Sequence, residues 1–412
     1  PGTRLATFLA AGLLGVSLFR FSFYFIIAAA LWTPVLVGLS VSLGSVVMEF
    51  WADYEQYALT GLLLVALGLF GLFKVGIPLL TRRGRRLLWS RYQRLTHWEF
   101  WPPWFFYPPL VAYILWLGMR FRHLTLFTAV NPSMPQSGFL GESKSAILRN
   151  LSAAGEFVAR WRLLPGGAPV EHRLDALVRF MTESGLEFPV VVKPDVGERG
   201  TGVSIVRSES EARESLAELT GPVIAQEFVE GPEFGIFYVR RPSEACGRIL
   251  SITEKRCLWL TGDGKRTIEE LILDDERAVC MARYHLRQHA AHIDDVPTEG
   301  ERYRLVEIGA HCRGSLFLDG SRILTPELEE TIDRIAKCDP GFFFGRFDLR
   351  APSEEAFRRG EGLKILELNG VTSEATHIYD PSNGLFHAYR VLARQWRESF
   401  EIAAENKARG VQ

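Results

Sequence analysis

Residues 190–203 read Val190-Val-Val-Lys193-Pro-Asp-Val-Gly197-Glu-Arg-Gly200-Thr-Gly202-Val203, and they are the first of an ordered set of motifs in the larger part of the chain. The β-branched run predicts a strand that ends in a lysine, and the glycines after it predict a hairpin. Such a hairpin brings backbone N–H groups close to phosphate oxygens, and the lysine adds a positive charge. Because the lysine precedes the glycines, this is not a Walker A loop. Taken alone, the stretch fits a phosphate-binding hairpin and an ordinary glycine turn equally well.

A second segment with chemical potential reads Ala225-Gln226-Glu227-Phe228-Val229-Glu230-Gly231-Pro232-Glu233. It predicts a strand that ends in hydrogen-bonding groups, a glycine turn and a new strand that begins with a glutamate. Groups around Glu227 can pair with the edge of an adenine, and Glu233 can pair with ribose hydroxyls. The alternative is an acidic loop that only meets solvent.

Two triplets predict a metal site, and they read Arg346-Phe347-Asp348 and Glu367-Leu368-Asn369. Side chains alternate along a strand, so the outer two residues of each triplet share a face. Two acids and one amide on that face form an oxygen-rich site suited to Mg²⁺. Arg346 beside them can neutralise a transferring phosphoryl group. The alternative for either triplet is a strand with solvent-facing charges.

The remaining pattern of the soluble part predicts an α+β or α/β arrangement. Lys255 is a candidate second phosphate contact, and the segment 262–268 opens a further helix over 268–273. We interpret Glu142-Ser143-Lys144 as a helix cap, with a substrate contact by Lys144 as the alternative. The loop 369–380 is expected to line the acceptor side. Strands are predicted over 189–192, 203–206, 222–225, 304–308 and 363–368, and helices over 173–183, 210–219 and 325–337.

In this order the motifs resemble the ATP-grasp superfamily, and within it the carboxylate–amine ligases typified by D-alanine–D-alanine ligase and cyanophycin synthetase. The resemblance covers residues 180–390. It implies an ATP-dependent ligase that forms a C–N bond between a carboxylate and an amine through an acyl phosphate. The implied cofactors are ATP and Mg²⁺, with two metal ions and with Mn²⁺ as a substitute.

The resemblance also assigns roles residue by residue. Lys255 would reach the γ-phosphate, and Arg346 would stabilise the transferred phosphate. Apart from the resemblance, Arg313 is a candidate contact to a carboxylate or phosphate, because the segment 308–314 is expected to line the acceptor side. The magnesium ligands would be Asp348, Glu367 and Asn369. The residues that would hold the nucleotide phosphates, adenine and ribose are Lys193, Gly197, Gly200, Gly202, Gln226, Glu227, Phe228, Val229 and Glu233.

The first 80 residues have a different composition. No charged residue occurs from Phe21 to Met48, and a second uncharged run from Gln56 to Phe73 continues past Lys74 to Leu80. About 20 apolar residues are enough to cross a bilayer core of roughly 30 Å. These runs therefore predict transmembrane helices, and 5–19 is a candidate for a third.

Charge predicts the orientation. Six arginines occur over 82–94, with no acid before Glu99, so this basic segment is expected on the cytoplasmic side. The aromatic and proline-rich stretch 98–109 and the apolar run Leu110–Met119 are interpreted as interfacial or re-entrant. The predicted division is a membrane domain over 1–80, an interfacial linker over 81–130 and a ligase domain over 131–412. The fold class is thus an α-helical transmembrane segment followed by an α+β ATP-grasp domain.

The beginning of the chain carries a second resemblance. Pro1-Gly2-Thr3-Arg4 followed by Ala10-Ala11-Gly12 resembles the P-G-x-R…A-G motif of DedA-family (SNARE-associated, VTT) membrane proteins. It implies the C-terminal half of such a domain, without its upstream half. The family is associated with transport of lipid carriers, so membrane lipids and a lipid-linked substrate are implied partners. The expected location is the cell (inner or plasma) membrane, multi-pass, with the ligase domain in the cytoplasm.

Composition excludes other classes of function. The 412 residues include 47 Lys and Arg against 48 Asp and Glu, a net charge of −1 that argues against a nucleic-acid partner. Five cysteines without a CxxC pair argue against a disulfide scaffold and a structural zinc site. Two alternatives stay open. One is a DedA-like lipid transporter whose ATP-grasp domain binds nucleotide as a regulator, and the other is a ligase of soluble amino acids with a membrane anchor.

Overall fold

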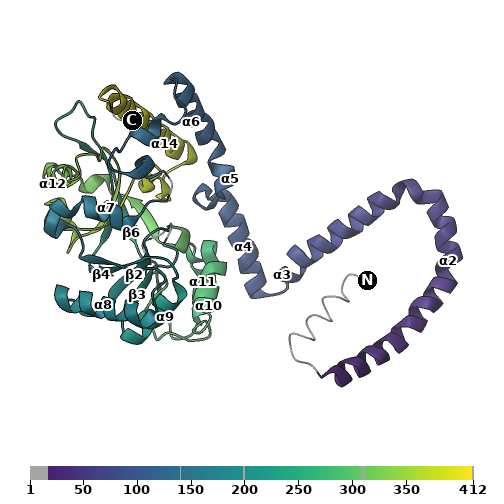
Figure 1. Ribbon diagram of the computed structural model, residues 1–412. Coiled ribbons are helices and arrows are strands. Elements are labelled where there is room, and N and C mark those ends of the chain that lie inside the picture. The colour runs from purple at the N-terminus through teal and green to yellow at the C-terminus, as the bar shows by residue number, and fades with distance from the viewer. Residues whose placement is uncertain (1–16, 140, 198–199, 308, 310, 411–412) are drawn as a thin grey trace. The chain divides into compact units, whose positions relative to one another are not determined.

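The computed structural model describes residues 17–139, 141–197, 200–307, 309 and 311–410. The chain forms two compact units, Pro1–Gly84 and Arg85–Gln412 (Figure 1). Residues 85–130 belong to the second of these units, whereas the sequence predicts a separate linker over 81–130. The DedA-like motif in the first 12 residues lies outside the described part of the chain.

The first unit is helical where it is described. Helix α2 (Leu18–Gly71) contains Pro34 and is followed by a π-helical turn (Leu72–Gly76) and by α3 (Ile77–Leu79). Residues 49–57, which lie between the two apolar runs, are part of α2.

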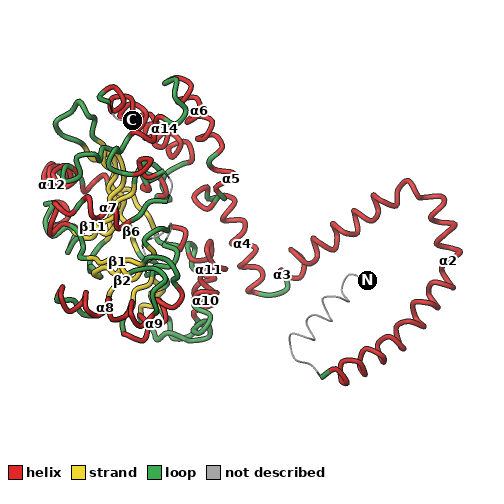
Figure 2. The backbone as a smooth tube through the Cα atoms, viewed as in Figure 1, coloured by secondary structure: helices red, strands yellow, loops and turns green. Residues whose placement is uncertain are grey.

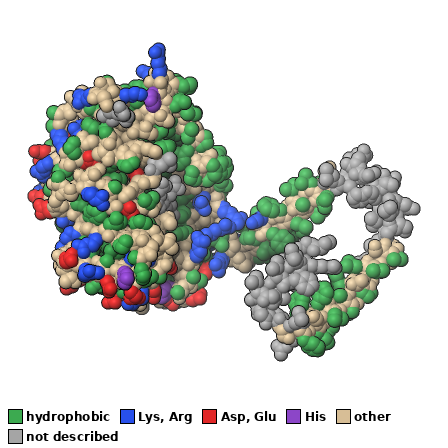
Figure 3. All heavy atoms as spheres, viewed as in Figure 1, with side chains coloured by type: hydrophobic (Ala, Val, Ile, Leu, Met, Phe, Trp, Pro, Cys, Tyr) green, Lys and Arg blue, Asp and Glu red, His purple; other side chains and the backbone are tan. Residues whose placement is uncertain are grey.

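Two stretches of this unit, Phe21–Ser42 and Thr60–Leu79, are long and apolar enough to cross a membrane, and none of either is buried by protein. The core helix of a soluble protein would be mostly buried. Hydrophobic side chains instead lie along the described surface of α2 (Figure 3). The predicted apolar helices are confirmed by length and composition, whereas the crossing of a bilayer stays a prediction.

The second unit contains a four-stranded sheet with the order β1-β4-β2-β3, in which all neighbours are antiparallel. Helices α8 (Val170–Ser184) and α9 (Glu209–Glu218) pack on it through a core that includes Leu177, Val192 and Leu216. The strands are β1 (Trp161–Leu164), β2 (Val190–Pro194), β3 (Ser204–Val206) and β4 (Val223–Glu227).

A five-stranded antiparallel sheet has the order β11-β10-β5-β6-β9 (Figure 2). One core beside it joins Ile147, Ile332 and Phe347, and another joins Phe237 and Phe400. The strands are β5 (Glu233–Val239), β6 (Arg248–Arg256), β9 (Leu316–Asp319), β10 (Phe344–Arg350) and β11 (Lys364–Asn369). The accompanying helices are α7 (Lys144–Asn150), α12 (Pro326–Ala336), α13 (Glu354–Arg358) and α14 (Leu385–Ala408).

Capping residues set where the helices begin. Ser143, Ser208, Thr267, Thr325 and Ser353 each accept a backbone N–H from the residue three positions on. These side chains satisfy donors that the first turn of a helix leaves unpaired. The predicted cap before α7 is confirmed.

A smaller part of the unit joins the strand pair β7–β8 to two short helices, and it shares a core through Leu260, Ile272 and Leu286. The predicted strand over 304–308 is wrong at this place, because β8 ends at Arg304. The other predicted strands and helices are present within a few residues of their expected bounds. The elements here are β7 (Trp259–Thr261), β8 (Arg302–Arg304), α10 (Ile268–Asp274) and α11 (Ala282–Gln288).

The first part of the second unit, residues 85–130, is mostly helical. It contains most of α4 (Arg82–Thr96), together with α5 (Pro103–Phe106) and α6 (Pro108–Arg120). In α6 the buried side chain of Leu117 shares a core with Phe400 of α14. The 13 residues of α6 are about 20 Å long, which is too short for a bilayer core of roughly 30 Å. This agrees with the interpretation that 110–119 does not span.

Candidate active site

A cavity of about 1240 Å³ lies where the two sheets meet. The sheets are joined at its floor, because Lys193 Nζ and Gln226 Nε2 both donate to the carbonyl of Leu366, at 3.0 and 3.1 Å. Lys193 and Gln226 belong to the four-stranded sheet, whereas Leu366 belongs to β11. The cavity therefore depends on both sheets.

Most predicted site residues line this cavity. Arg313 and Gly202 are not among the described residues that line it. Arg313 instead donates from Nη2 to the carbonyl of Gly200. The predicted residues that line the cavity are Lys193, Gly197, Gly200, Gln226, Glu227, Phe228, Val229, Glu233, Lys255, Arg346, Asp348, Glu367 and Asn369.

The two triplets face each other on neighbouring strands. In the antiparallel register of β10 and β11, Arg346 lies opposite Asn369 and Asp348 lies opposite Glu367. The expected sharing of a face is thereby confirmed for all four side chains, which line the cavity together.

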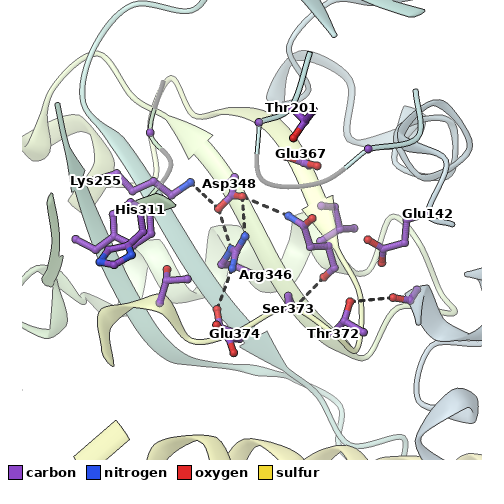
Figure 4. A pocket seen from close by; sticks show the side chains of 18 of the residues that line it. Glu142, Thr201, Lys255, His311, Arg346, Asp348, Glu367, Thr372, Ser373 and Glu374 are labelled. Atoms are coloured by element: carbon purple, nitrogen blue, oxygen red, sulfur yellow. Dashed lines mark hydrogen bonds and ion pairs between the residues drawn. The ribbon is translucent and has the colours of Figure 1, made fainter. Parts of the chain in front are cut away.

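Asp348 is the centre of this group. Its Oδ1 lies 3.0 Å from both Lys255 Nζ and Arg346 Nε, and Asn369 Nδ2 donates to its Oδ2 at 3.3 Å. Burial alone would raise the pKa of Asp348, but the charges of Arg346 and Lys255 outweigh burial and lower the pKa to about 2. The carboxylate is therefore ionised at neutral pH. Figure 4 shows Lys255 and Arg346 converging on it.

Gly235 makes room for this cluster, and the sequence motifs did not indicate it as a site residue. It lies opposite Asp348 in the register of β5 and β10. A Cβ atom at this position would come within 3.3 Å of Asp348 Oδ1 and 3.4 Å of Arg346 Cδ. Its place two positions after Glu233 on a β-strand is visible in the sequence, but a glycine inside a strand more often marks a bulge or a bend than a site.

Lys255 also pairs with Glu233, which lies opposite it in the register of β5 and β6. The distance from Lys255 Nζ to Glu233 Oε1 is 3.0 Å, and Arg350 Nη2 lies 3.1 Å from Glu233 Oε2. Burial would lower the pKa of Lys255, but Asp348 and Glu233 outweigh it and raise the pKa. A cation at this point is thus kept charged inside the protein.

Lys193 is held in a different way. Its ammonium donates to Gln226 Oε1 at 2.8 Å and to the Leu366 carbonyl, and burial lowers its pKa, against the charge of Glu367. Gln226 therefore positions the lysine. Of the other residues in its motif, Glu227 pairs with Arg160 at 3.0 Å, and the Val229 carbonyl accepts from Arg350 Nη1 at 2.7 Å.

The glycine loop between β2 and β3 is described at residues 195–197 and 200–203. Gly200 and Gly202 have φ of +74° and +71°, a conformation that L side chains rarely adopt. Lys144 Nζ donates to the Gly197 carbonyl at 2.6 Å and lies 3.6 Å from Glu367 Oε1. The alternative role of Lys144 as part of the site is thus favoured by its position, since its side chain is buried and lines the cavity.

Glu142 is a further acid beside the predicted magnesium ligands, which are Asp348, Glu367 and Asn369. Its Oε1 accepts the Gly370 N–H at 2.8 Å. Burial raises the pKa of Glu142 to about 7, and the neighbouring charge of Glu367 acts in the same direction. Nothing in its sequence context distinguishes it from a helix-cap residue.

The loop after Asn369, which is expected to line the acceptor side, provides Glu374 to the cavity. The carbonyl of Glu374 accepts from Arg346 Nη1 at 3.0 Å, and its carboxylate accepts from Tyr107 at 2.6 Å and from Tyr379 at 2.9 Å. Burial, with the charge of Glu374, raises the pKa of Tyr379, so this hydroxyl stays a donor. Figure 4 shows Arg346 between Asp348 and Glu374.

An apolar wall completes the cavity, and motif reasoning missed it. Its segment is anchored by Glu99, which pairs with His311 at 2.9 Å and Arg277 at 3.3 Å, and by Trp98, which donates to the Asn383 carbonyl at 3.0 Å. We define the apolar wall as Trp101, Leu110, Val111, Ile114, Leu115 and Trp396.

The residues of the two triplets fit magnesium. Among the described residues no group of three or more His, Cys, Asp or Glu is placed to hold a metal. Asp348, Glu367 and Asn369 instead offer two carboxylates and one amide oxygen on one face, all lining the cavity. Mg²⁺ prefers few protein oxygens together with substrate phosphates. The donor set therefore suits a magnesium–nucleotide complex better than a metal held by protein alone.

Part of the four-stranded sheet region matches a known domain family. Residues 154–235 match the RimK-like ATP-grasp domain family. The matched residues include Lys193, the glycine loop after it and the segment 225–233. The match confirms the prediction of an ATP-grasp domain of the kind found in ATP-dependent C–N ligases.

Two curated relatives are cyanophycin synthetases. That of Geminocystis herdmanii is 24% identical over 221 residues, which cover 48% of this chain and 24% of that protein. That of Crocosphaera subtropica is 25% identical over 221 residues, with the same coverage. The chain thus spans about a quarter of the length of these relatives.

Two of the solved structures that the chain matches do so with low TM-scores. D-alanine–D-alanine ligase from Bacillus anthracis has a TM-score of 0.38 at 14% identity, over 68% of this chain and 71% of that chain. The bifunctional glutathione synthetase from Pasteurella multocida has a TM-score of 0.35 at 17% identity, over 65% and 38%.

Proposed function

We propose that the chain is an ATP- and Mg²⁺-dependent carboxylate–amine ligase that acts through an acyl phosphate. The observation that carries this proposal is the pairing of Arg346 and Asp348 with Asn369 and Glu367 across two strands, in one cavity with Lys193. Oxygen ligands for a metal, a cation for the transferred group and a buried lysine are the parts that phosphoryl transfer requires.

The reaction has two steps. A carboxylate oxygen attacks the γ-phosphorus of ATP, the bond to the β-phosphate oxygen breaks, and ADP leaves. An amine nitrogen then attacks the carbonyl carbon, the bond to the phosphate oxygen breaks, and an amide and phosphate are formed. The starting ammonium loses two protons in total, of which one leaves on the phosphate and one is released.

Asp348, Glu367 and Asn369 would hold the magnesium. Bound there, the ion would neutralise charge on the phosphate oxygens during transfer. Lys193 would hold the phosphates, Lys255 would meet the γ-phosphate, and Arg346 would stabilise negative charge on the transferred group. These side chains act mainly by position and charge, because they are already oriented before the reaction begins.

The more specific part of the proposal concerns the membrane. We propose a membrane-anchored ligase whose first 80 residues are the C-terminal half of a DedA-like domain, with the ligase domain in the cytoplasm and with a lipid-linked substrate. The two apolar, unburied stretches and the arginines that follow them support an anchor. The apolar wall of the cavity is an argument for a substrate that contains a hydrocarbon chain.

ADP formation tests this function. The full chain in bilayer nanodiscs would receive MgATP and a panel of amino acids, with and without bilayer lipid extract, beside Asp348→Asn. Lipid-stimulated turnover that is lost in Asp348→Asn is the expected result, and turnover with amino acids alone would favour a soluble substrate. Nucleotide binding without turnover under any condition would favour the regulatory domain of a lipid transporter.

A further inference from the structure

The cavity is larger than a nucleotide site requires. Its volume of about 1240 Å³ exceeds the roughly 300–1,000 Å³ of ordinary small-molecule pockets. The apolar wall lies on the segment 101–115 and at Trp396, outside the residues 154–235 that match the ATP-grasp family. The extra space therefore belongs to a part of the site that the nucleotide motifs do not explain.

The apolar wall keeps large apolar side chains open to this space. Val111 and Leu115 are 49% and 51% exposed, and both line the cavity. Tyr107, at the beginning of α6, and Leu115 are separated by about 12 Å along the helix. A wall of this length suits a hydrocarbon chain, because burying each methylene is favourable.

The carboxylate of Glu374, near the first turn of α6, determines which charged group a bound hydrocarbon chain can have. Tyr107 directly precedes α6, and its hydroxyl donates to the carboxylate of Glu374. The nearby guanidinium of Arg346 is already bonded to Asp348 and to the Glu374 carbonyl. A carboxylate held by two tyrosines at this point attracts an ammonium and repels a second carboxylate.

We infer that the apolar wall holds the hydrocarbon chain of an amine-headed amphiphile, and that Glu374 binds its ammonium. This inference rests on the proposed ligase function, in which the amine is the second substrate. It places that amine beside Arg346, where the acyl phosphate is formed. It also assigns Tyr107 and Tyr379 to the positioning of Glu374.

Binding of n-alkylamines tests the inference without turnover. The full chain in phosphatidylcholine nanodiscs would be titrated by calorimetry with ethylamine, butylamine, hexylamine and octylamine. We expect the affinity to rise about threefold to fourfold for each added methylene. Val111→Gln and Leu115→Gln should remove this dependence. Met119→Gln is the matched control, because Met119 is an exposed apolar residue of the same helix that does not line the cavity.

The head group is tested by Glu374→Gln and by octanoate. Glu374→Gln should weaken octylamine binding at least about tenfold, as expected for the loss of a charge-assisted contact, and leave ATP binding intact. Octanoate should bind more weakly than octylamine. The inference is overturned if octanoate binds equally well, if chain length has no effect, or if Leu115→Gln behaves like Met119→Gln.

Two further comparisons separate this inference from the ligase function and identify the source of the amine. Alkylamine binding without any ADP formation would leave the inference standing and remove the ligase function, whereas ADP formation with short amines and no alkylamine binding would do the reverse. Phosphatidylethanolamine in the nanodisc should compete with octylamine if the amine is a bilayer lipid. The absence of competition, with octylamine bound, supports a soluble long-chain amine.

Discussion

The charged side of the cavity and its apolar wall are built in different ways. The charged side stands on β2, β5, β6, β10 and β11, where strand register fixes which side chains meet. The apolar wall stands mainly on α6 and the turn before it, which are attached through Glu99, Trp98 and the core around Leu117. One side is built from two sheets whose strand register sets its geometry, and the other is a helical segment packed beside them.

Because of this difference, a sequence motif can predict the charged side but not the apolar wall. Phosphate and magnesium require particular residue types at particular positions, so the charged side has a recognisable pattern. A hydrocarbon chain can pack against any large apolar residues, so the apolar wall has no recognisable sequence pattern. The predictions below test how independent the two sides are.

The largest loss of activity is expected when a predicted magnesium ligand is changed. Glu367→Gln removes a carboxylate that faces Asp348, and the rate of ADP formation should fall at least about a hundredfold because charge on the transferred group is no longer balanced. Alkylamine binding at the apolar wall should be unchanged. Glu230→Gln is the control, since Glu230 is exposed and does not line the cavity. Equal rates for the two variants would contradict the assigned role of Glu367.

A somewhat smaller effect is expected at Lys193. Lys193→Met removes a buried cation that Gln226 positions, and the affinity for a non-hydrolysable ATP analogue should fall about tenfold to a hundredfold. Calorimetry in the absence of turnover measures this. Lys265→Met, an exposed lysine outside the cavity, should bind like the wild type. Unaltered affinity in Lys193→Met would place the phosphates elsewhere.

Gly235→Ala tests how tightly the charged side is packed. The new Cβ would lie within 3.3 Å of Asp348 Oδ1, so the carboxylate must shift and the rate of ADP formation should fall about tenfold. Gly221→Ala, where no atom lies within 4 Å of an added Cβ, should have no such effect. A fully active Gly235→Ala enzyme would show that the cluster tolerates displacement.

Tyr107→Phe, the smallest predicted change, acts where the two sides meet. It removes one hydrogen bond to Glu374, worth about 1 kcal/mol, while Tyr379 keeps the other. Octylamine binding should weaken about fivefold with ATP affinity unchanged. If ATP affinity fell equally, the two sides would not be separable.

The sequence predicted the charged side well, for a physical reason. Lys193, the two triplets and the strands that carry them follow local patterns, and antiparallel register then brings Asp348 opposite Glu367. Gly235 and Glu374 became recognisable only once the strands and loops were placed in space. Arg313, a candidate contact to a carboxylate or phosphate, donates to the Gly200 carbonyl and is not among the described residues that line the cavity.

The segment 98–119 shows why the rest was harder to predict. Its tryptophans, prolines and apolar residues predicted a membrane interface, yet Leu110 and Leu117 are buried in the second unit. Apolar side chains favour lipid, a protein core and a substrate chain for the same reason. Which of these they meet depends on tertiary packing, here the position of α14, and not on local sequence.

The origin of the oxygen in the released phosphate shows whether the reaction passes through an acyl phosphate. The full chain in nanodiscs would form ADP from MgATP in water enriched in oxygen-18, with lipid extract and amino acids as substrates. A ligase transfers the phosphoryl group to a carboxylate oxygen, so the phosphate should carry no oxygen from the solvent. Phosphate that carries one solvent oxygen for each ADP would mean attack by water on the γ-phosphorus, and it would contradict a ligase that acts through an acyl phosphate.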